Sequence, residues 1–147
     1  SSLKKEQREA IKMQFVEAKW ITNEALASPD LFKYTAGKTV VHRDKDGNNI
    51  TSEVSYLGSQ MKQSVIDELK SNIKTLGTLK KKGKKVGAIR FKREVNSINL
   101  KQYGATYRVL NKHKINLKTK KAVSFFQILI IFIYHLMRSA YLNLNQH

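Results

Sequence analysis

The first part of the chain repeats apolar residues at three- and four-residue intervals, which predicts an amphipathic helix over residues 1–27. Its apolar stripe consists of Ile11, Phe15, Val16, Ala18, Trp20, Ile21, Thr22, Ala25 and Leu26. Pro29 ends the helix, because a residue that precedes proline avoids the helical conformation. The opposite side carries Lys4, Lys5, Arg8, Lys12 and Lys19. We interpret that side as the solvated face of a packed helix.

Two β-branched runs within residues 38–54 flank Asp46-Gly47, a dipeptide typical of a hairpin turn. The spacing of Asp44, Asp46 and Asn48 is similar to the first half of a calcium-binding loop. Such a loop needs a glutamate at its twelfth position, where this chain has a serine. We therefore interpret these residues as turn formers.

A second helical pattern begins at Ser59, which we expect to be its N-cap residue. Its apolar face consists of Met61, Val65, Ile66, Leu69, Ile73 and Leu76. Gly77 is expected to interrupt this helix and Gly83 to end it, because glycine is a poor helix former.

From Val86 onward the pattern changes to short segments rich in β-branched and aromatic residues, with polar residues often alternating. The segments are 87–93, 97–104, 105–111 and 112–117. They predict three or four strands of an antiparallel sheet or partial barrel. Residues 122–137 are then nearly all apolar, which indicates a further helix. At sixteen residues it is shorter than the about 20 that span a bilayer, so a tail anchor and a buried helix are both open.

The predicted fold class is therefore α+β: two amphipathic helices with a small antiparallel β-sheet or partial barrel, plus an apolar C-terminal helix. Three regions are expected. Residues 1–79 form a mainly helical region that contains the hairpin at 38–54, residues 80–121 a basic loop with β-strands, and residues 122–147 an atypical hydrophobic tail.

Charge is concentrated in the second region. The chain of 147 residues has a formal net charge of +17, from 28 basic and 11 acidic residues. Residues 80–121 hold 15 Lys or Arg and a single carboxylate, that of Glu94. Such an excess destabilises a compact chain by self-repulsion and attracts polyanions. Nucleic acid and the anionic leaflet of a membrane are the two partners to consider.

Lysines and arginines of this block can contact phosphates without reading bases, and aromatic side chains among them can stack on bases. The candidate nucleic-acid-binding residues from the block are Lys80, Lys81, Lys82, Lys84, Lys85, Arg90, Lys92, Arg93, Lys101, Arg108, Tyr103 and Tyr107. For the tyrosines, a place in the core is the alternative.

No catalytic site can be assembled from the sequence. Metal-dependent cleavage of phosphodiesters needs converging carboxylates, and Glu94 is the only acidic residue after position 68. The four histidines lack ligand spacing, and no cysteine is present. We therefore expect no metal site, no cofactor and no catalysis by this chain alone.

Several stretches resemble the N-terminal part of the TnpB (OrfB) family of transposon-encoded proteins, often labelled transposases. They are EAKW, GSQMKQSVIDELKSNIKTL, GKKVGAIRFKREVNSINLKQYG and LNKHKIN, and they span most of residues 3–118. The resemblance implies an RNA-guided DNA endonuclease related to type V CRISPR effectors, in which base pairing reads the sequence. It implies a helical recognition lobe and a wedge-like barrel built from residues 38–54 and 86–118. It also implies contacts from Gln60, Lys62 and Gln63 to the target-adjacent duplex, where glutamine can pair with adenine.

The family's RuvC-like carboxylates and its cysteine-rich zinc element lie downstream and have no counterpart in this chain. The family-like sequence stops near Lys121, so we interpret residues 122–147 as a frameshifted or decayed reading frame. Reading the gene in its other two frames beyond this point tests that interpretation.

The sequence therefore predicts a nucleic-acid-binding fragment of a TnpB-like nuclease, with guide RNA and target DNA as partners in a prokaryotic cytoplasm. One alternative is a membrane-associated basic protein tethered by residues 122–137. Another is an RNA-binding protein of ribosomal type.

Overall fold

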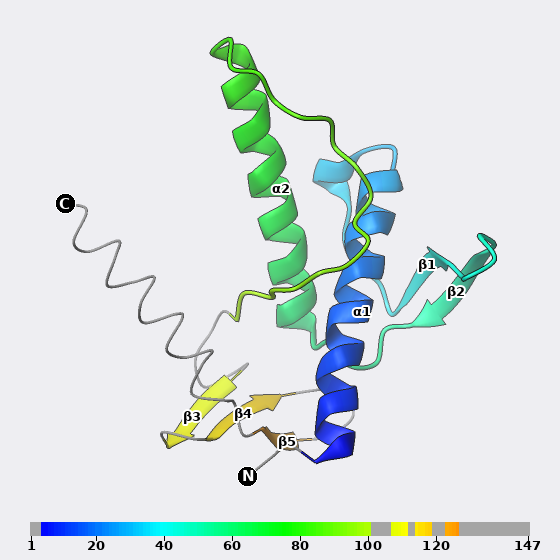
Figure 1. The fold of residues 1–147 in the computed structure, drawn as a ribbon, viewed down its shortest axis with the longest axis vertical. Coiled ribbons are helices and arrows are strands. Elements are labelled where there is room, and N and C mark those ends of the chain that lie inside the picture. Colours follow the sequence, from blue (N-terminus) through cyan, green and yellow to red (C-terminus); the bar gives the residue numbers. More distant parts are fainter. Residues whose placement is uncertain (1–3, 101–106, 112–113, 119–122, 127–147) are drawn as a thin grey trace.

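The computed structural model describes residues 4–100, 107–111, 114–118 and 123–126, which form an α+β fold (Figure 1). Two long helices, α1 (Lys5–Ala27) and α2 (Ser59–Lys81), flank a 3-10 turn at Leu31–Lys33 and the hairpin of β1 (Thr39–Arg43) and β2 (Asn49–Glu53). The strands β3 (Tyr107–Asn111), β4 (Lys114–Lys118) and β5 (Val123–Phe126) follow. The predicted class and both predicted helices are confirmed.

The core lies where α1, α2 and the hairpin meet. Its buried apolar residues are Ala18, Ile21, Val40, Val54, Leu57, Met61, Val65 and Ile66. On α2 these residues all belong to the first two turns, whereas the last turns of the helix are exposed. Because 23 residues of helix are about 34 Å long, the second half of α2 extends away from the core (Figure 1).

The hairpin forms as predicted, with Val41 opposite Thr51 and Arg43 opposite Asn49. Gly47 has φ of 86°, which explains the glycine in the turn. The Asp44 carboxylate accepts hydrogen bonds from the backbone N–H groups of Asp46 and Asn48, both at 2.9 Å. These hydrogen bonds, that of Asn48 first, lower the pKa of Asp44. The turn interpretation of this acidic cluster is therefore confirmed.

Two side chains of α1, Glu24 and Trp20, contact the hairpin and the segment just before it. Glu24 of α1 accepts hydrogen bonds from the Val41 backbone N–H, at 2.9 Å, and from the Tyr34 hydroxyl. Partial burial and this bond to Glu24 raise the pKa of Tyr34. Trp20 of α1 stacks on His42 of β1, with ring centroids 3.8 Å apart and planes within 8°.

The ends of α2 differ from the prediction at two positions. The N-cap residue is Gly58, and Ser59 is already the first residue of the helix. Gly77 does not interrupt the helix, which continues to Lys81. One glycine costs about 1 kcal/mol in a helix, and Leu79, Lys80 and Lys81 beyond it are good helix formers. Gly83, with φ of 74°, ends the helix as predicted.

The strand predicted at 87–93 does not form, and no strand forms over 97–100. Residues 84–100, which we call the return segment, run from the tip of α2 back along α1 and α2 without regular structure (Figure 1). The segment lies against helices, whose backbone groups are already paired, so no strand edge is available to it. The rest of the predicted strand 97–104 lies outside the described residues.

Strands β3 and β4 form at the two later predicted segments, and β5 extends them into a three-stranded antiparallel sheet of order β3-β4-β5. The wedge-like barrel expected from 38–54 and 86–118 is not formed by the described residues, since β1-β2 and β3-β4-β5 are separate sheets. The predicted apolar C-terminal helix is wrong at Val123–Phe126, which is strand β5. Pairing with β4 supplies the ladder hydrogen bonds that favour a strand there.

The remainder of the apolar tail, residues 127–147, lies outside the described residues. Among the helices that the structure does describe, none combines the length and hydropathy needed to cross a membrane.

Candidate nucleic-acid interface

The lysines at the end of α2 belong to a helix terminus rather than to the loop predicted from the sequence. Lys80 and Lys81 occupy the last turn, and Lys82 is the C-cap residue. The Lys84 N–H donates to the Leu79 carbonyl and the Gly83 N–H to the Lys80 carbonyl, both at 3.0 Å. This is a Schellman motif, which satisfies carbonyls at a helix end. Cations there also interact favourably with the helix dipole, so these lysines have a structural role besides any binding role.

The return segment is attached to the helices at two places. The Asn23 side chain accepts from the Lys92 backbone N–H at 2.7 Å and donates to the Lys92 carbonyl at 2.9 Å. Further along, the Ser64 hydroxyl donates to the Asn99 carbonyl at 2.6 Å, and the Asn99 amide donates to Glu68 at 2.8 Å. Three apolar side chains of the segment pack on the core, namely Val95, Ile98 and Leu100. The helices therefore position the second half of the segment.

The first half of the return segment is exposed together with its charges. The predicted binding residues Lys84, Lys85, Arg90, Lys92 and Arg93 are all exposed. Between them, Ile89 and Phe91 are 56% and 64% exposed, which is unusual for large apolar side chains. Among the described residues, no carboxylate forms an ion pair with any basic side chain from Lys80 to Arg93. The charge of this stretch is therefore uncompensated within the part of the fold that the structure describes.

The three residues that the family resemblance places on target-adjacent DNA lie in the first turns of α2. Gln60 is exposed. The Lys62 ammonium donates to the Gly37 carbonyl at 2.9 Å, and the Gln63 amide donates to Asp67 at 2.8 Å. Lys62 and Gln63 thus already have partners within the chain, and a contact from either to DNA would compete with them.

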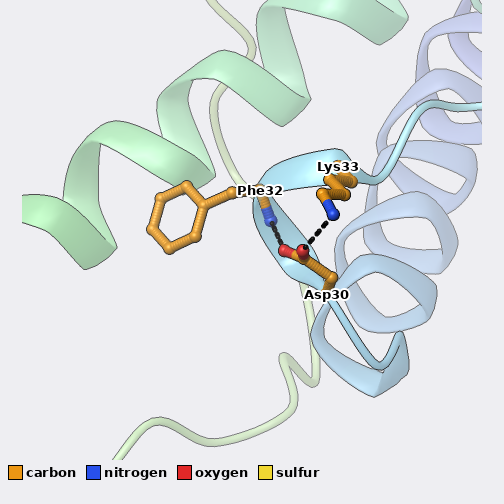
Figure 2. Close-up of polar contacts among 3 residues, drawn as sticks. All are labelled: Asp30, Phe32 and Lys33. Carbon is orange, nitrogen blue, oxygen red and sulfur yellow. Dashed lines mark hydrogen bonds and ion pairs between the residues drawn. The ribbon is translucent and has the colours of Figure 1, made fainter.

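Lys62 is one of three α2 lysines that hold residues 32–37 against the helix. Lys70 donates to the Tyr34 carbonyl at 3.1 Å, and the Lys74 ammonium lies 5.8 Å from the centroid of the Phe32 ring. Figure 2 shows the Phe32 ring directed toward α2.

The turn that carries this ring is braced locally. The Asp30 carboxylate accepts from the Phe32 N–H at 3.1 Å and forms an ion pair with Lys33 at 3.6 Å (Figure 2). Lys62, Lys70 and Lys74 of α2 are thus engaged in packing, whereas the cations at the tip of α2 and in the first half of the return segment are exposed.

The remaining predicted residues belong to or precede the sheet. Arg108 of β3 is exposed, and Tyr107 is partly buried and has a partner within the chain. Lys101 and Tyr103 lie outside the described residues. The candidate residues therefore do not form one compact patch: they follow the chain from the tip of α2 down the return segment.

The structure adds two lysines that the sequence analysis assigned to a solvated face. Lys12 and Lys19 of α1 line a pocket of about 330 Å3 together with Arg93 of the return segment. The rest of the lining is Phe15, Val16, Glu94, Val95 and Asn96. Positions 12 and 93 are far apart in the sequence, so no local pattern indicates that they share a pocket.

The described residues contain no group of three or more His, Asp or Glu side chains that could hold a metal ion. The cationic and aromatic surface can bind anions and stack on flat rings, and these are the chemical properties on which a function can be argued.

No protein-family model matches this chain, and no match was found among curated proteins or solved structures.

Proposed function

We propose that this chain binds nucleic acid through the basic stretch Lys80–Arg93. One observation carries the proposal: eight basic side chains lie in fourteen residues, and none forms an ion pair with a carboxylate of the described residues. Phosphate groups of a nucleic-acid backbone supply the missing negative charge, and binding releases their condensed counterions.

The exposed apolar side chains within this stretch favour a single-stranded segment or a loop of a structured RNA. Phe91 and Ile89 stand next to Arg90 and Lys92 in sequence and are more than half exposed. An aromatic ring among cations can stack on an unpaired base, and such stacking tolerates any sequence. A duplex offers only its backbone and groove edges to these side chains.

We further propose that the nucleic acids are the guide RNA and target DNA of a TnpB-like protein. The support is the resemblance in residues 57–110 and the order of the elements, in which a helix leads into a basic segment. In this proposal the chain binds and does not cleave, because Glu94 is the only carboxylate after position 68.

Binding of the full chain to a fluorescent single-stranded RNA and to a DNA duplex, measured by anisotropy at several salt concentrations, tests the proposal. The logarithm of the affinity should fall linearly with the logarithm of the salt concentration. Replacing Arg90 and Lys92 by glutamine should reduce the slope for single strands by about 1.4, since each phosphate contact contributes about 0.7.

The matched control is the pair Lys38→Gln and Lys45→Gln, two exposed lysines of the hairpin region that remove the same charge. This control should change the slope much less. Affinity that does not depend on salt, or an equal loss in both pairs of substitutions, would contradict the assignment of binding to this stretch.

A further inference from the structure

Of the three cations that line the pocket of Lys12, Lys19 and Arg93, only Arg93 belongs to the basic stretch of the proposed function. Lys12 and Lys19 are seven residues apart on α1, so they lie on the same side of the helix, separated by about 10 Å along its axis. Arg93 comes from the return segment and lines the same pocket. Its floor contains Phe15 and Val16, which are partly buried.

The three cations of this pocket outnumber its carboxylates. Glu94 is the one carboxylate in the lining, and it accepts a hydrogen bond from Asn96 at 3.3 Å. None of the three cations forms an ion pair with Glu94 or with any other described carboxylate. Like charges gathered at one place repel each other, and an anion between them removes that repulsion.

The pocket exists because the return segment is attached next to it. Asn23 binds both backbone groups of Lys92, at 2.7 and 2.9 Å, and Arg93 is the next residue. On the other side of Arg93, Val95 packs against the core. The backbone at Arg93 is therefore held over α1 from both sides.

We propose that Lys12, Lys19 and Arg93 form a phosphate-binding site, which the hydrogen bonds of Asn23 to Lys92 assemble. This inference rests on the proposed function in taking a phosphodiester of the bound strand as the ligand. A strand that follows the return segment from the tip of α2 then reaches α1, where the site takes up one of its phosphates. Free inorganic phosphate presents the same chemistry and is the second possible source.

The oligonucleotide assay described above tests the site on the full chain. Replacing both Lys12 and Lys19 by glutamine should reduce the salt slope for a single-stranded RNA by about 0.7, as expected for the loss of one phosphate contact. The pair Lys38→Gln and Lys45→Gln removes the same charge elsewhere and should leave the slope near that of the unmodified chain. Equal losses in both pairs would mean that only the total charge matters, and would overturn the proposal.

Asn23→Ala separates positioning from charge, because it removes no charge. It should reduce the slope by less than about 0.7, since Arg93 alone loses its position and both lysines remain. Asn72→Ala, at an exposed position of α2, is the matched control and should have no effect. If Asn23→Ala also leaves the salt slope unchanged, while thermal unfolding shows an intact fold, then the hydrogen bonds of Asn23 to Lys92 do not assemble the site. That part of the proposal is then wrong.

Titration with inorganic phosphate, followed by the backbone amide signals of Val16 and Arg93, separates this proposal from the proposed function. Shifts that disappear in the Lys12→Gln, Lys19→Gln variant, without any oligonucleotide binding, would support the site and refute nucleic acid as its ligand. Oligonucleotide binding that is unaffected by this variant would support the proposed function and overturn the site. No response to either ligand would refute both.

Discussion

Glu17 is a buried carboxylate that orders the chain just before α2. Its side chain is 1% exposed, and its two oxygens accept hydrogen bonds from the backbone N–H groups of Ser55, Tyr56 and Leu57 at 2.8 to 3.1 Å. These donors precede the helix and would otherwise be left without partners in or near the core. Hydrogen bonds to a charged acceptor are stronger than neutral ones, so one side chain positions the entry to α2.

Glu17→Ala should lower the free energy of unfolding by about 3 kcal/mol, because it leaves several partly buried N–H groups without an acceptor. Urea unfolding followed by circular dichroism measures the change. Glu9→Ala, at an exposed position of the same helix, is the control and should alter stability by less than about 0.5 kcal/mol. A similar effect of both substitutions would show that the loss comes from the helix itself and not from the hydrogen bonds to 55–57.

Gly77 within α2 and Gly83 just beyond its end are two glycines whose replacement should have opposite effects. Gly77 lies inside the helix with open space at the position of a Cβ atom, whereas Gly83 has φ of 74° at the helix end, also in open space. Neither site offers a steric clash, so backbone conformation alone decides the sign of the effect.

Gly77→Ala should stabilise the chain by about 0.8 kcal/mol, since alanine loses less conformational entropy in a helix. Gly83→Ala should destabilise it by about 1 kcal/mol, because a residue with a Cβ atom resists the left-handed conformation. Urea unfolding of the two variants in parallel gives both values. Effects of the same sign would mean that the helix does not end at Gly83 in solution.

The chain has a net charge of +17, and in the residues that the structure describes its core cluster consists of only eight buried apolar side chains. Eight of the 28 basic residues lie in the fourteen residues Lys80–Arg93, which hold no carboxylate, so these charges repel each other. Mobile salt screens this repulsion, and the same salt weakens attraction to a polyanion. Stability and binding should therefore respond to salt in opposite directions.

The melting temperature of the free chain should rise by about 3 °C as sodium chloride increases from about 10 mM to about 100 mM, since the Debye length falls from about 30 to about 10 Å. Differential scanning fluorimetry measures it. A variant with Lys81, Lys82, Lys84 and Lys85 replaced by glutamine should show a smaller rise. A melting temperature that falls with salt would mean that attractive ion pairs, rather than repulsion, dominate the electrostatics of the fold.

Local patterns in the sequence were sufficient for α1, α2, the hairpin, and strands β3 and β4. In each, the periodicity or turn chemistry lies within a few neighbouring residues, as with the Asp46-Gly47 turn and Gly83 at the end of α2. The alternating pattern at 87–93 predicted a strand that does not form. A strand needs a neighbouring strand with unpaired backbone N–H and C=O groups, and this segment lies beside helices, whose backbone groups are already paired.

The composition of the basic stretch, and with it the candidate ligand class, could also be read from the sequence. Which of its residues meet α1 depends on contacts between distant positions. Asn23 and Lys92 are 69 positions apart, and Glu17 reaches N–H groups 38 to 40 positions away. Such pairings produce no periodic pattern in the sequence, because they depend on which polar groups face one another once the helices have packed. Folding thus brings Lys12 and Lys19 into one pocket with Arg93. The number and sign of these charges follow from the sequence alone.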